Sequence, residues 1–506
     1  MCGIAGIWGE VDQLLVQQVM DQMAHRGPDG SGMHLQSSQG VLGHRRLAIM
    51  DPTGGAQPIY NESGSASIVA NGEIYNFPAL RNQLGQHHHF STTSDSEAIL
   101  HLFEDQDVNL AQSLQGMFAF AIQQGDRLFL ARDPIGIKPL YYGQRQGSDG
   151  KAQFYFASEM KALADWADNI HEFPPGHYYD SQRGFVQYYT SPTAPPIARP
   201  LAEQIKLVRQ SLEDAVASHL MSDVPVGAFL SGGLDSSVIA AMARKHVKEL
   251  HTFAVGVEGS NDVLAARKVA AHIGSIHHEY LFTPSEVIAK LPEIIHALES
   301  FDQDLVRSAI PCYFCSRLAA DYVKVILTGE GADELFAGYK YHKEIPDPAI
   351  LHRELCRTVT TLHNINLQRV DRLTMHHSIE GRVPFLDTHF IATSLSVHAE
   401  HKIVTMPNGQ RMEKWILRKA CEDLLPADIV WRTKEQFDEG SGTVNLLSEA
   451  LNRLIEKIDA PTYQARSNEY LRSPEEAVYH KLLVDSYRRP QAILPNVARW
   501  VSNRIQ

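Results

Sequence analysis

The chain has few cysteines and no long apolar run. Its five cysteines are odd in number and scattered over 506 residues, which argues against a disulfide framework and favours a reducing compartment. No apolar stretch approaches the roughly 18 residues that indicate a membrane span, and the first ten residues carry no secretory signal. We therefore expect a cytoplasmic protein that does not contact a membrane.

Basic residues are also in deficit. The chain has 46 Lys and Arg against 59 Asp and Glu, which gives a net charge of −13. Because nucleic-acid binding depends on clustered Lys and Arg, we expect no nucleic-acid partner. The length favours two or three domains. The length does not determine the oligomeric state, and a homodimer is one of the states that it allows.

The pattern of apolar residues changes from strand-like to helical near a proline-rich stretch, TSPTAPPIARP at 190–200. Before this stretch, short apolar runs broken by Gly, Pro and Asn predict antiparallel strands. Helical patterns are few there, and one of them lies at 95–105. The apolar runs lie at 41–51, 66–77, 117–133, 139–144 and 152–158. We expect a linker at the prolines, and domains at 2–190 and 204–506.

Long helical patterns follow the prolines, for example at 201–221 and 285–301. They alternate with single apolar strands at 225–230, 250–257 and 323–329. This alternation predicts an α/β domain with a mainly parallel sheet.

Cys2 stands directly behind the initiator methionine in MCGIAGIWGE. Aminopeptidases generally remove Met1 when a small residue follows, which would leave Cys2 with a thiol and a free α-amine. The amine, with a reference pKa of about 7.7–8.0, can accept the thiol proton. Alone, the dipeptide is a weak signal.

Further motifs follow in order: HRGPDG (25–30), GHRRLAIMD (43–51), NGEIYN (71–76), TSDSE (93–97) and ARDPIGIKPLYY (131–142). With the opening MCGIAGI, they resemble the class II, N-terminal-nucleophile glutamine amidotransferases over residues 2–185. The resemblance implies an Ntn-hydrolase αββα sandwich, so that the whole chain would be α+β followed by α/β.

The resemblance implies that Cys2 attacks the glutamine amide, with an oxyanion hole from Asn71 and the Gly72 N–H. Arg46 would bind the glutamine α-carboxylate, and Glu73 and Asp95 its ammonium. The remaining glutamine contacts would come from Leu47, Ala48, Ile49 and Met50. Taken singly, these residues have structural explanations: Asn71-Gly72 a hairpin turn, Arg46 a surface ion pair, and Asp95 a helix cap. The ordered set favours the functional interpretation.

A Ser/Gly turn, SGGLDSS at 231–237, joins an apolar strand to a helical pattern. This geometry directs backbone N–H groups and a helix N-terminus at one point, which suits a phosphate. The string is no Walker A loop, and it resembles the pyrophosphate loop of ATP pyrophosphatases. Downstream, VILTGEGADELFAGY (325–339) places carboxylates beside glycines after a second strand. Asp235 and Asp333 are suitable ligands for Mg²⁺ on ATP phosphates.

The motifs EGRVPFLD (380–387), MEKWILRKA (412–420), WRTKEQFDEGSG (431–442) and FAVGVEGSNDVLAARKVAAHIGSIHHE (253–279) complete this half. From about 205 to near 485 the chain closely resembles asparagine synthetases of the glutamine-hydrolysing kind. The resemblance implies a ligase that forms β-aspartyl-AMP from aspartate and ATP and amidates it with ammonia made at Cys2. Asparagine, AMP and pyrophosphate would be the products.

The same resemblance implies roles for single residues. Glu330 would assist attack by ammonia, Lys434 would stabilise the transferring phosphate, and Arg307 would lie near the acyl-adenylate. Pyrophosphate and metal would be bound by Ser231, Gly232, Gly233, Asp235, Ser236 and Ser237, and the adenosine pocket lined by Leu230, Val255, Thr328 and Gly329.

One departure concerns Asp304 and Leu305, where many relatives carry small hydroxyl residues. It keeps open an alternative, a related amidotransferase that amidates another carboxylic acid. A phosphoribosyl-type amidotransferase is disfavoured by SGGLDSS, and a degenerate glutamine sensor by the competent residue at every site position.

Two remaining features favour structural explanations. Cys312 and Cys315 form an isolated CxxC within an amphipathic pattern, which favours core packing over metal or redox use. The run His87, His88, His89 lies outside the motifs, and we expect a solvated loop there.

Overall fold

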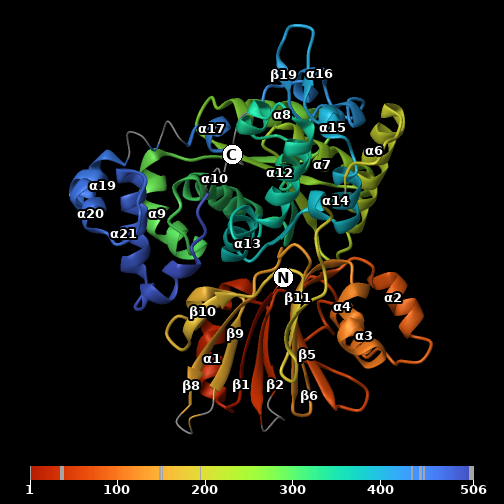
Figure 1. Ribbon diagram of the computed structural model, residues 1–506, viewed down its shortest axis with the longest axis vertical. Coiled ribbons are helices and arrows are strands. Elements are labelled where there is room, and N and C mark those ends of the chain that lie inside the picture. Colours follow the sequence, from red (N-terminus) through yellow and green to blue (C-terminus); the bar gives the residue numbers. More distant parts are fainter. Residues whose placement is uncertain are drawn as a thin grey trace.

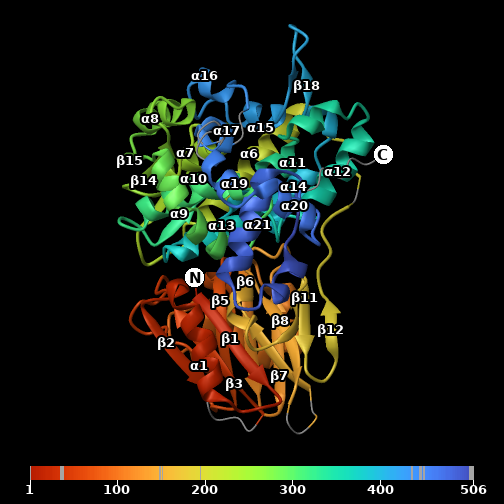
Figure 2. The same cartoon turned by 90° about the vertical axis from the view of Figure 1, so that its left-hand side faces the viewer.

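The structure is a computed structural model that describes residues 2–34, 39–147, 150, 152–193, 195–434, 437–443, 447 and 451–500. The N-terminal part of the chain, red to yellow, forms the lower half in Figure 1, and the C-terminal part, green to blue, the upper half. The segment between β12 and α6 runs along the outside of the molecule from the lower half to the upper half (Figure 2).

Two six-stranded antiparallel sheets form the N-terminal part. The first contains, in spatial order, β10 (Asp168–Glu172), β8 (Tyr141–Gln146), β9 (Ala152–Ala157), β1 (Cys2–Trp8), β3 (Gly40–Arg46) and β2 (Gly30–His34). The second contains β12 (Gly184–Gln187), β11 (His177–Asp180), β7 (Arg127–Arg132), β6 (Gly116–Gln124), β5 (Ala66–Ile74) and β4 (Ile59–Tyr60).

Helices cover the outer face of each sheet. On the first sheet they are α1 (Gln13–Gln22) and α5 (Met160–Leu163), and on the second α2 (Phe77–Leu84), α3 (Asp95–Gln106) and α4 (Leu110–Ser113). Successive side chains of a strand alternate between faces, so Ile4 packs between the sheets, whereas Ala5 packs under α1. The αββα sandwich implied by the resemblance is confirmed.

A parallel five-stranded sheet organises the C-terminal part. Its spatial order is β15 (Ile276–Leu281), β14 (His251–Gly256), β13 (Val226–Phe229), β16 (Val325–Leu327) and β17 (Glu380–Arg382). Alternation along β14 sends Ala254 into one core cluster and Phe253 and Val255 into another, so both faces are covered. The predicted α/β architecture is confirmed.

Helices supply most of the remaining chain. They are α6 (Leu201–Ser218), α7 (Leu234–His246), α8 (Asn261–Ile273), α9 (Pro284–Leu298), α10 (Gln303–Ala319), α11 (Ala332–Phe336), α12 (Pro348–Thr360), α13 (Asn366–His376), α14 (Thr388–Leu395), α15 (Trp415–Ala420), α16 (Ala427–Val430), α17 (Phe437–Gly440), α19 (Asn452–Lys457), α20 (Ala460–Arg466) and α21 (Pro474–Ser486). A small hairpin of β18 (Val404–Thr405) and β19 (Arg411–Met412) projects at the top (Figures 1 and 2). Among the described residues, no helix is long and apolar enough to span a bilayer.

All five cysteines are buried and free. Cys312 and Cys315 lie within α10, where burial raises the pKa of Cys312 to about 11, and the Cys315 thiol lies 3.6 Å from the Phe253 carbonyl oxygen. The predicted core packing of this CxxC is confirmed.

The two parts meet across buried charges. Arg26 forms two hydrogen bonds, of 2.7 and 3.0 Å, with Asp371 in the other part, and one of 2.7 Å with Glu159 in its own. Arg372 contacts Asp371 at 3.1 Å and Glu299 at 2.8 Å. All five side chains are buried, so each charge depends on its partners for compensation.

We expect Asp371→Asn to destabilise the protein by about 3 kcal/mol, because it leaves the buried Arg26 and Arg372 short of one counter-charge. Thermal unfolding monitored by fluorescence would measure the loss. The matched control is Lys324→Met, which breaks a 2.7 Å ion pair with Asp29 that also joins the two parts but is partly exposed. It should cost less than about 1 kcal/mol. Equal effects of the two substitutions would contradict the structural importance of the buried pairs.

Candidate active sites

Cys2 begins strand β1 at the boundary between the two parts (Figure 2). It pairs with Arg46 across the β1–β3 ladder, and its backbone N–H donates to Asn71 Oδ1 at 3.0 Å. Arg26 Nε donates to the Cys2 carbonyl oxygen at 3.0 Å, so the arginine that pairs with Asp371 also fixes the cysteine backbone. The structure therefore brings Cys2, Arg46 and Asn71 together.

Asn71 and Gly72 are placed for an oxyanion hole. Asn71 Oδ1 accepts from Cys2, so the amide nitrogen of Asn71, Nδ2, is oriented away from Cys2. This buried Nδ2 has no hydrogen-bond partner among the described residues. A Cβ on Gly72 would lie 2.0 Å from the Met117 carbonyl oxygen, so only glycine fits. Both residues lie within β5, opposite Ala119 and Phe118 of β6, so the hairpin-turn explanation is wrong.

The Cys2 thiol lies 3.9 Å from the Leu47 carbonyl oxygen in a buried site. Burial raises the pKa of this thiol, so the thiolate is not abundant at neutral pH. A base beside the sulfur is required, which is the task that a free α-amine of the same residue would perform.

Residues 47–50 form the loop beside the thiol. Arg46 orders this loop, because its guanidinium donates to the carbonyl oxygens of Met50 at 3.3 Å, Asp51 at 2.6 Å and Pro52 at 3.1 Å. These three bonds come from NH1 and NH2. A guanidinium has five N–H donors, so two are left for a further partner. Among the described residues these carbonyl oxygens, and not a carboxylate, bind Arg46, so the surface ion pair that was its structural alternative is not observed. Leu47, Ala48 and Ile49 are buried and Met50 is half-buried.

Asp95 and Glu73 are both buried but differ in their contacts. Asp95 Oδ2 accepts from the Ile74 N–H at 2.7 Å, and burial raises the pKa of Asp95 to about 6. The cap of α3 is Ser94 rather than Asp95. Glu73 lies 3.4 Å from Arg382 of the C-terminal part, and burial, Glu380 and Asp95 raise its pKa. Glu73 is therefore an interface residue as well as the neighbour of Gly72 in β5.

The raised pKa of Asp95 gives a pH prediction. Below pH 6 the carboxyl group is protonated and loses its attraction for a substrate ammonium group. In the inactive Cys2→Ala variant, the Kd for glutamine should rise about tenfold per pH unit below that value. Calorimetry at several pH values would measure it. Adding Asp95→Asn should weaken binding at pH 7.5 and reduce the pH dependence to what Glu73 contributes; an unchanged slope would remove Asp95 from the ammonium site.

The second site is a cavity of about 370 Å³ in the C-terminal part. Ser231, between β13 and α7, donates through its backbone N–H to Ser236 Oγ at 3.1 Å, and their hydroxyls lie 3.0 Å apart. The cavity is lined by Leu230, Ser231, Gly233, Asp235, Ser236, Val255, Thr328 and Gly329. Of the predicted loop residues, Gly232 and Ser237 lie outside this lining.

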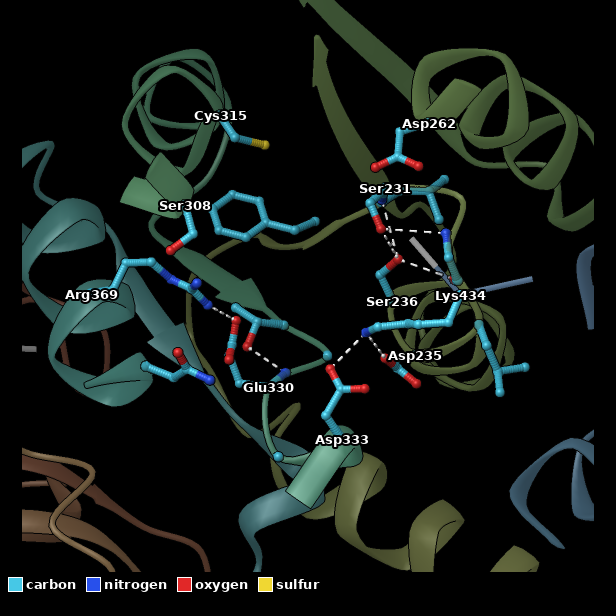
Figure 3. Close-up of a pocket in the computed structure, with 18 of the residues that line it drawn as sticks. Ser231, Asp235, Ser236, Asp262, Ser308, Cys315, Glu330, Asp333, Arg369 and Lys434 are labelled. Atoms are coloured by element: carbon cyan, nitrogen blue, oxygen red, sulfur yellow. Dashed lines mark hydrogen bonds and ion pairs between the residues drawn. The ribbon is translucent and has the colours of Figure 1, made fainter. Parts of the chain in front are cut away.

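Two lysines join the two predicted metal ligands across the cavity, and Figure 3 shows one of them, Lys434, between Asp235 and Asp333. Lys414 Nζ lies 2.5 Å from Asp235 Oδ2 and 2.6 Å from Asp333 Oδ1. Lys434 Nζ lies 2.6 Å from Asp333 Oδ2 and 3.7 Å from Asp235 Oδ2. We call these four residues the lysine–aspartate cluster. Burial opposes ionisation of Asp333, but the ammonium groups outweigh it and hold its pKa far below the usual range.

Oxygen ligands suit Mg²⁺, and one oxygen of the cluster remains free for it. Asp235 Oδ1 is buried and has no hydrogen-bond partner in the part of the chain that the structure describes. The ammonium groups keep Asp333 ionised, and the ionised carboxylate is the form that binds a metal. The residues present therefore fit a divalent cation.

Glu330 faces the opposite side of the cavity and is paired with Arg369 of α13 (Figure 3). The glycine-rich motif around Glu330 suggests no such partner, and this ion pair comes from 39 residues further along the chain. Burial nevertheless raises the pKa of Glu330, with Arg369 acting in the opposite direction.

Arg307 does not line the cavity, although its neighbours Asp304, Leu305 and Ser308 do. Its guanidinium binds Glu475 of α21 in two hydrogen bonds of 2.8 and 2.6 Å. The structure thus holds Arg307 in a pairing between α10 and α21, away from the lining where the resemblance implied it.

The residues that the sequence did not identify as belonging to the sites include Arg26, Arg369 and Lys414. Arg26 and Lys414 lie inside motifs quoted above, HRGPDG and MEKWILRKA, so position within a motif was an available signal for them. Arg369 lies in none of the quoted motifs. Only the packing of α13 against the cavity identifies it.

Comparison with known proteins agrees with this pair of sites. Residues 1–173 match a glutamine amidotransferase domain family, and residues 207–347 and 343–493 match the asparagine synthase family. Asparagine synthetase [glutamine-hydrolyzing] 3 of Arabidopsis thaliana is 41% identical over 87% of this chain and 79% of its own length. The probable asparagine synthetase [glutamine-hydrolyzing] of Dictyostelium discoideum is 36% identical over 99% of this chain and 96% of its own. The chain belongs to the family of glutamine-hydrolysing asparagine synthetases.

Proposed function

We propose that this protein makes asparagine from aspartate, ATP and the amide nitrogen of glutamine. Residues 2–190 would act as the glutaminase and residues 204–506 as the synthetase. The observation that carries the proposal is the presence on one chain of a buried N-terminal thiol with an oxyanion hole and a cavity with a phosphate-type loop. The names of the relatives support the same substrates.

At the first site, the α-amine of Cys2 takes the thiol proton once Met1 has been removed. The thiolate attacks the side-chain carbonyl carbon of glutamine, and the oxyanion is stabilised by Asn71 Nδ2 and the Gly72 N–H. Collapse of the tetrahedral intermediate breaks the carbon–nitrogen bond, and the amine returns its proton to the departing ammonia. Water then hydrolyses the thioester to glutamate, with Arg46 and Asp95 binding the α-substituents throughout.

At the second site, the β-carboxylate of aspartate attacks the α-phosphorus of ATP and pyrophosphate leaves. Ser231, Ser236 and the α7 N-terminus are suited to bind the pyrophosphate. Asp235 and Asp333 would hold Mg²⁺, which supplies positive charge at the phosphates. Lys434, beside both carboxylates, is positioned to neutralise charge on the transferring phosphate.

Ammonia then attacks the β-carbonyl carbon of aspartyl-AMP, and AMP departs as the leaving group. A free carboxylate would not react this way, because oxide is too poor a leaving group. We assign Glu330 the proton that nitrogen loses in this step. Its position in the cavity lining, opposite the lysine–aspartate cluster, supports this role.

Asp304 does not oppose aspartate as the acid. Its carboxylate lies 3.1 Å from Arg472, so its charge is compensated within the protein. Among the described residues, the charged side chains that line the cavity include five cations: Lys414, Lys434, Arg369, Arg418 and Arg432. The same lining carries five carboxylates, Asp235, Asp262, Asp304, Glu330 and Asp333, so it offers partners both for the carboxylates and for the ammonium group of an amino acid such as aspartate. All five cysteines being free supports a reducing cytoplasm as the site of action.

The test uses glutamine labelled with ¹⁵N in its side chain, with aspartate, ATP, Mg²⁺ and a tenfold excess of unlabelled ammonium. We expect ¹⁵N-asparagine by mass spectrometry, together with stoichiometric AMP and pyrophosphate. A parallel screen of other carboxylic acids should give less pyrophosphate than aspartate. Asparagine without label would contradict coupling of the two sites, and preference for another acid would replace aspartate.

Glu330→Gln separates activation from amide formation. It keeps the side-chain shape but removes the proton acceptor, so asparagine formation should fall about 10²- to 10⁴-fold. Positional isotope exchange in ATP, which reports adenylation, should fall far less. The matched control is Glu334→Gln, a buried neighbour that hydrogen-bonds Tyr339 and lies outside the cavity lining. It should leave the ratio of the two signals unchanged, and equal loss of both in Glu330→Gln would refute the assigned role.

A further inference from the structure

We propose that the N-terminal part binds a divalent transition metal of the Zn²⁺ class at Glu62, His88, His101 and Glu104. The four come from three separate segments: Glu62 from the β4–β5 turn, His88 from the α2–α3 loop, and His101 and Glu104 from α3. Helices α2 and α3 lie at the right-hand edge of the lower half in Figure 1. The inference is independent of the proposed function.

One ligand atom of each side chain lies within 4.8 Å of the other three. His88 Nδ1 lies 3.8 Å from Glu62 Oε2 and 3.8 Å from Glu104 Oε2, and His101 Nδ1 lies 3.0 Å from Glu104 Oε2. Ligand atoms around a tetrahedral Zn²⁺ at 2.0–2.1 Å are about 3.3 Å apart. These three separations bracket that value, and rotation of one imidazole out of its stack with the other would let two nitrogens and two oxygens bind one ion.

The other polar atom of each ligand already has an outer partner. His88 Nε2 is 3.0 Å from Asp105 Oδ1, and Glu104 Oε1 accepts from Asn61 Nδ2 at 2.7 Å. Glu62 Oε1 accepts from the backbone N–H of His89. Carboxylate partners on ligating histidines fix the tautomer that presents the free nitrogen to a metal.

His101 completes this outer set and anchors the site. Its side chain is fully buried, and its Nε2 lies 3.6 Å from Glu97 Oε1, so a second carboxylate faces the remote nitrogen of a histidine. The ring stacks on that of His88 with centroids 4.5 Å apart, which places both Nδ1 atoms beside Glu104. A buried histidine held by carboxylates on either side is pre-organised for a cation.

The composition of the site selects the metal class. Two imidazoles with two carboxylates suit Zn²⁺ and its neighbours, whereas Mg²⁺ and Ca²⁺ favour all-oxygen sites. The two carboxylates also match the charge of a divalent ion. His88 is only 11% exposed, so the solvated loop expected for the histidine run is wrong at this position. Glu62, at 41%, leaves a path for the ion from solvent.

A neighbouring triplet, His87, His88 and Asp105, is the competing arrangement. It offers three ligands, and His87 is 52% exposed, so it lacks both the fourth ligand and the buried anchor. In the favoured arrangement Asp105 orients His88 from outside. The metal would then join the β4–β5 turn and the α2–α3 loop to α3, the helix that begins with Asp95.

The test titrates Co²⁺ into the full-length protein after treatment with EDTA and dialysis. We expect intense visible absorption typical of tetrahedral Co²⁺, saturating at one ion per chain and displaced by Zn²⁺. His88→Ala and Glu104→Gln should each weaken Co²⁺ binding at least about 100-fold. The matched control, His87→Ala, should bind normally. Circular dichroism would confirm that each variant is folded.

Zn²⁺ at a hundred times its Kd should also raise the Tm of the wild type by about 5 °C, and leave that of His88→Ala unchanged. Absence of the tetrahedral spectrum would overturn the proposal. So would normal binding by both ligand variants, or a loss in His87→Ala equal to that in His88→Ala, which would assign the ion to the triplet.

Discussion

Cys2→Ala should abolish glutamine hydrolysis while leaving asparagine formation from added ammonium intact. The thiol is the nucleophile and no other cysteine replaces it, because the remaining four are buried elsewhere in the C-terminal part. Loss of a covalent nucleophile costs on the order of 10⁶ in kcat. The second cavity contains no part of Cys2, so adenylation should proceed at its normal rate. Glutamate release and ammonium-dependent asparagine yield would measure the two activities.

The matched control is Cys421→Ala, which removes a buried thiol from the other part of the chain. It should lower stability through a small cavity but preserve glutamine use. Residual glutaminase activity in Cys2→Ala near the wild-type rate would contradict the N-terminal-nucleophile mechanism. Loss of the ammonium-dependent reaction as well would mean that the substitution disturbs the whole fold.

Asp235→Asn should stop pyrophosphate release while preserving basal glutaminase activity. The change removes a charge on which both lysines of the cluster depend, together with one of the two proposed metal ligands. Removing a group that positions and neutralises phosphates costs about 10³-fold or more. The requirement for Mg²⁺ should rise in the residual reaction. Pyrophosphate assays at increasing Mg²⁺, beside glutamate release in the same samples, would measure both effects.

Asp423→Asn serves as the control, because this exposed aspartate pairs with Arg209 far from the cavity lining. It should leave both activities unchanged. If Asp235→Asn lowered glutaminase activity as much as pyrophosphate release, the two sites would be less separable than their separate geometries imply.

Sequence patterns were most informative where local rules apply. Alternating and continuous apolar runs located β5, β6, β7 and β9, since side-chain period and burial are properties of the strand itself. Ordered motifs located Cys2, Asn71 and Asp235, because each chemical role demands a particular residue type. The helix cap that was the structural alternative for Asp95 is supplied by Ser94, the residue before it.

Partners distant in sequence could not be predicted. The pairing of Glu330 with Arg369, and of Arg307 with Glu475, depends on how α13 and α21 pack, and no local pattern encodes that. The same holds for Arg26 and Asp371, which lie 345 residues apart and meet only because the two halves dock. Charged side chains indicate that a partner exists when they are buried, and burial is itself a tertiary property.

The lysine–aspartate cluster implies an order of events in nucleotide binding. Before substrates arrive, Lys414 and Lys434 serve as internal counter-ions to Asp235 and Asp333. A lone Mg²⁺ therefore meets carboxylates that are already neutralised, and must compete with covalently tethered cations. The triphosphate offers these ammonium groups new anionic partners, and so releases the carboxylates at the moment that the metal arrives. Metal and nucleotide should consequently bind with positive synergy, each increasing the affinity for the other by the same factor.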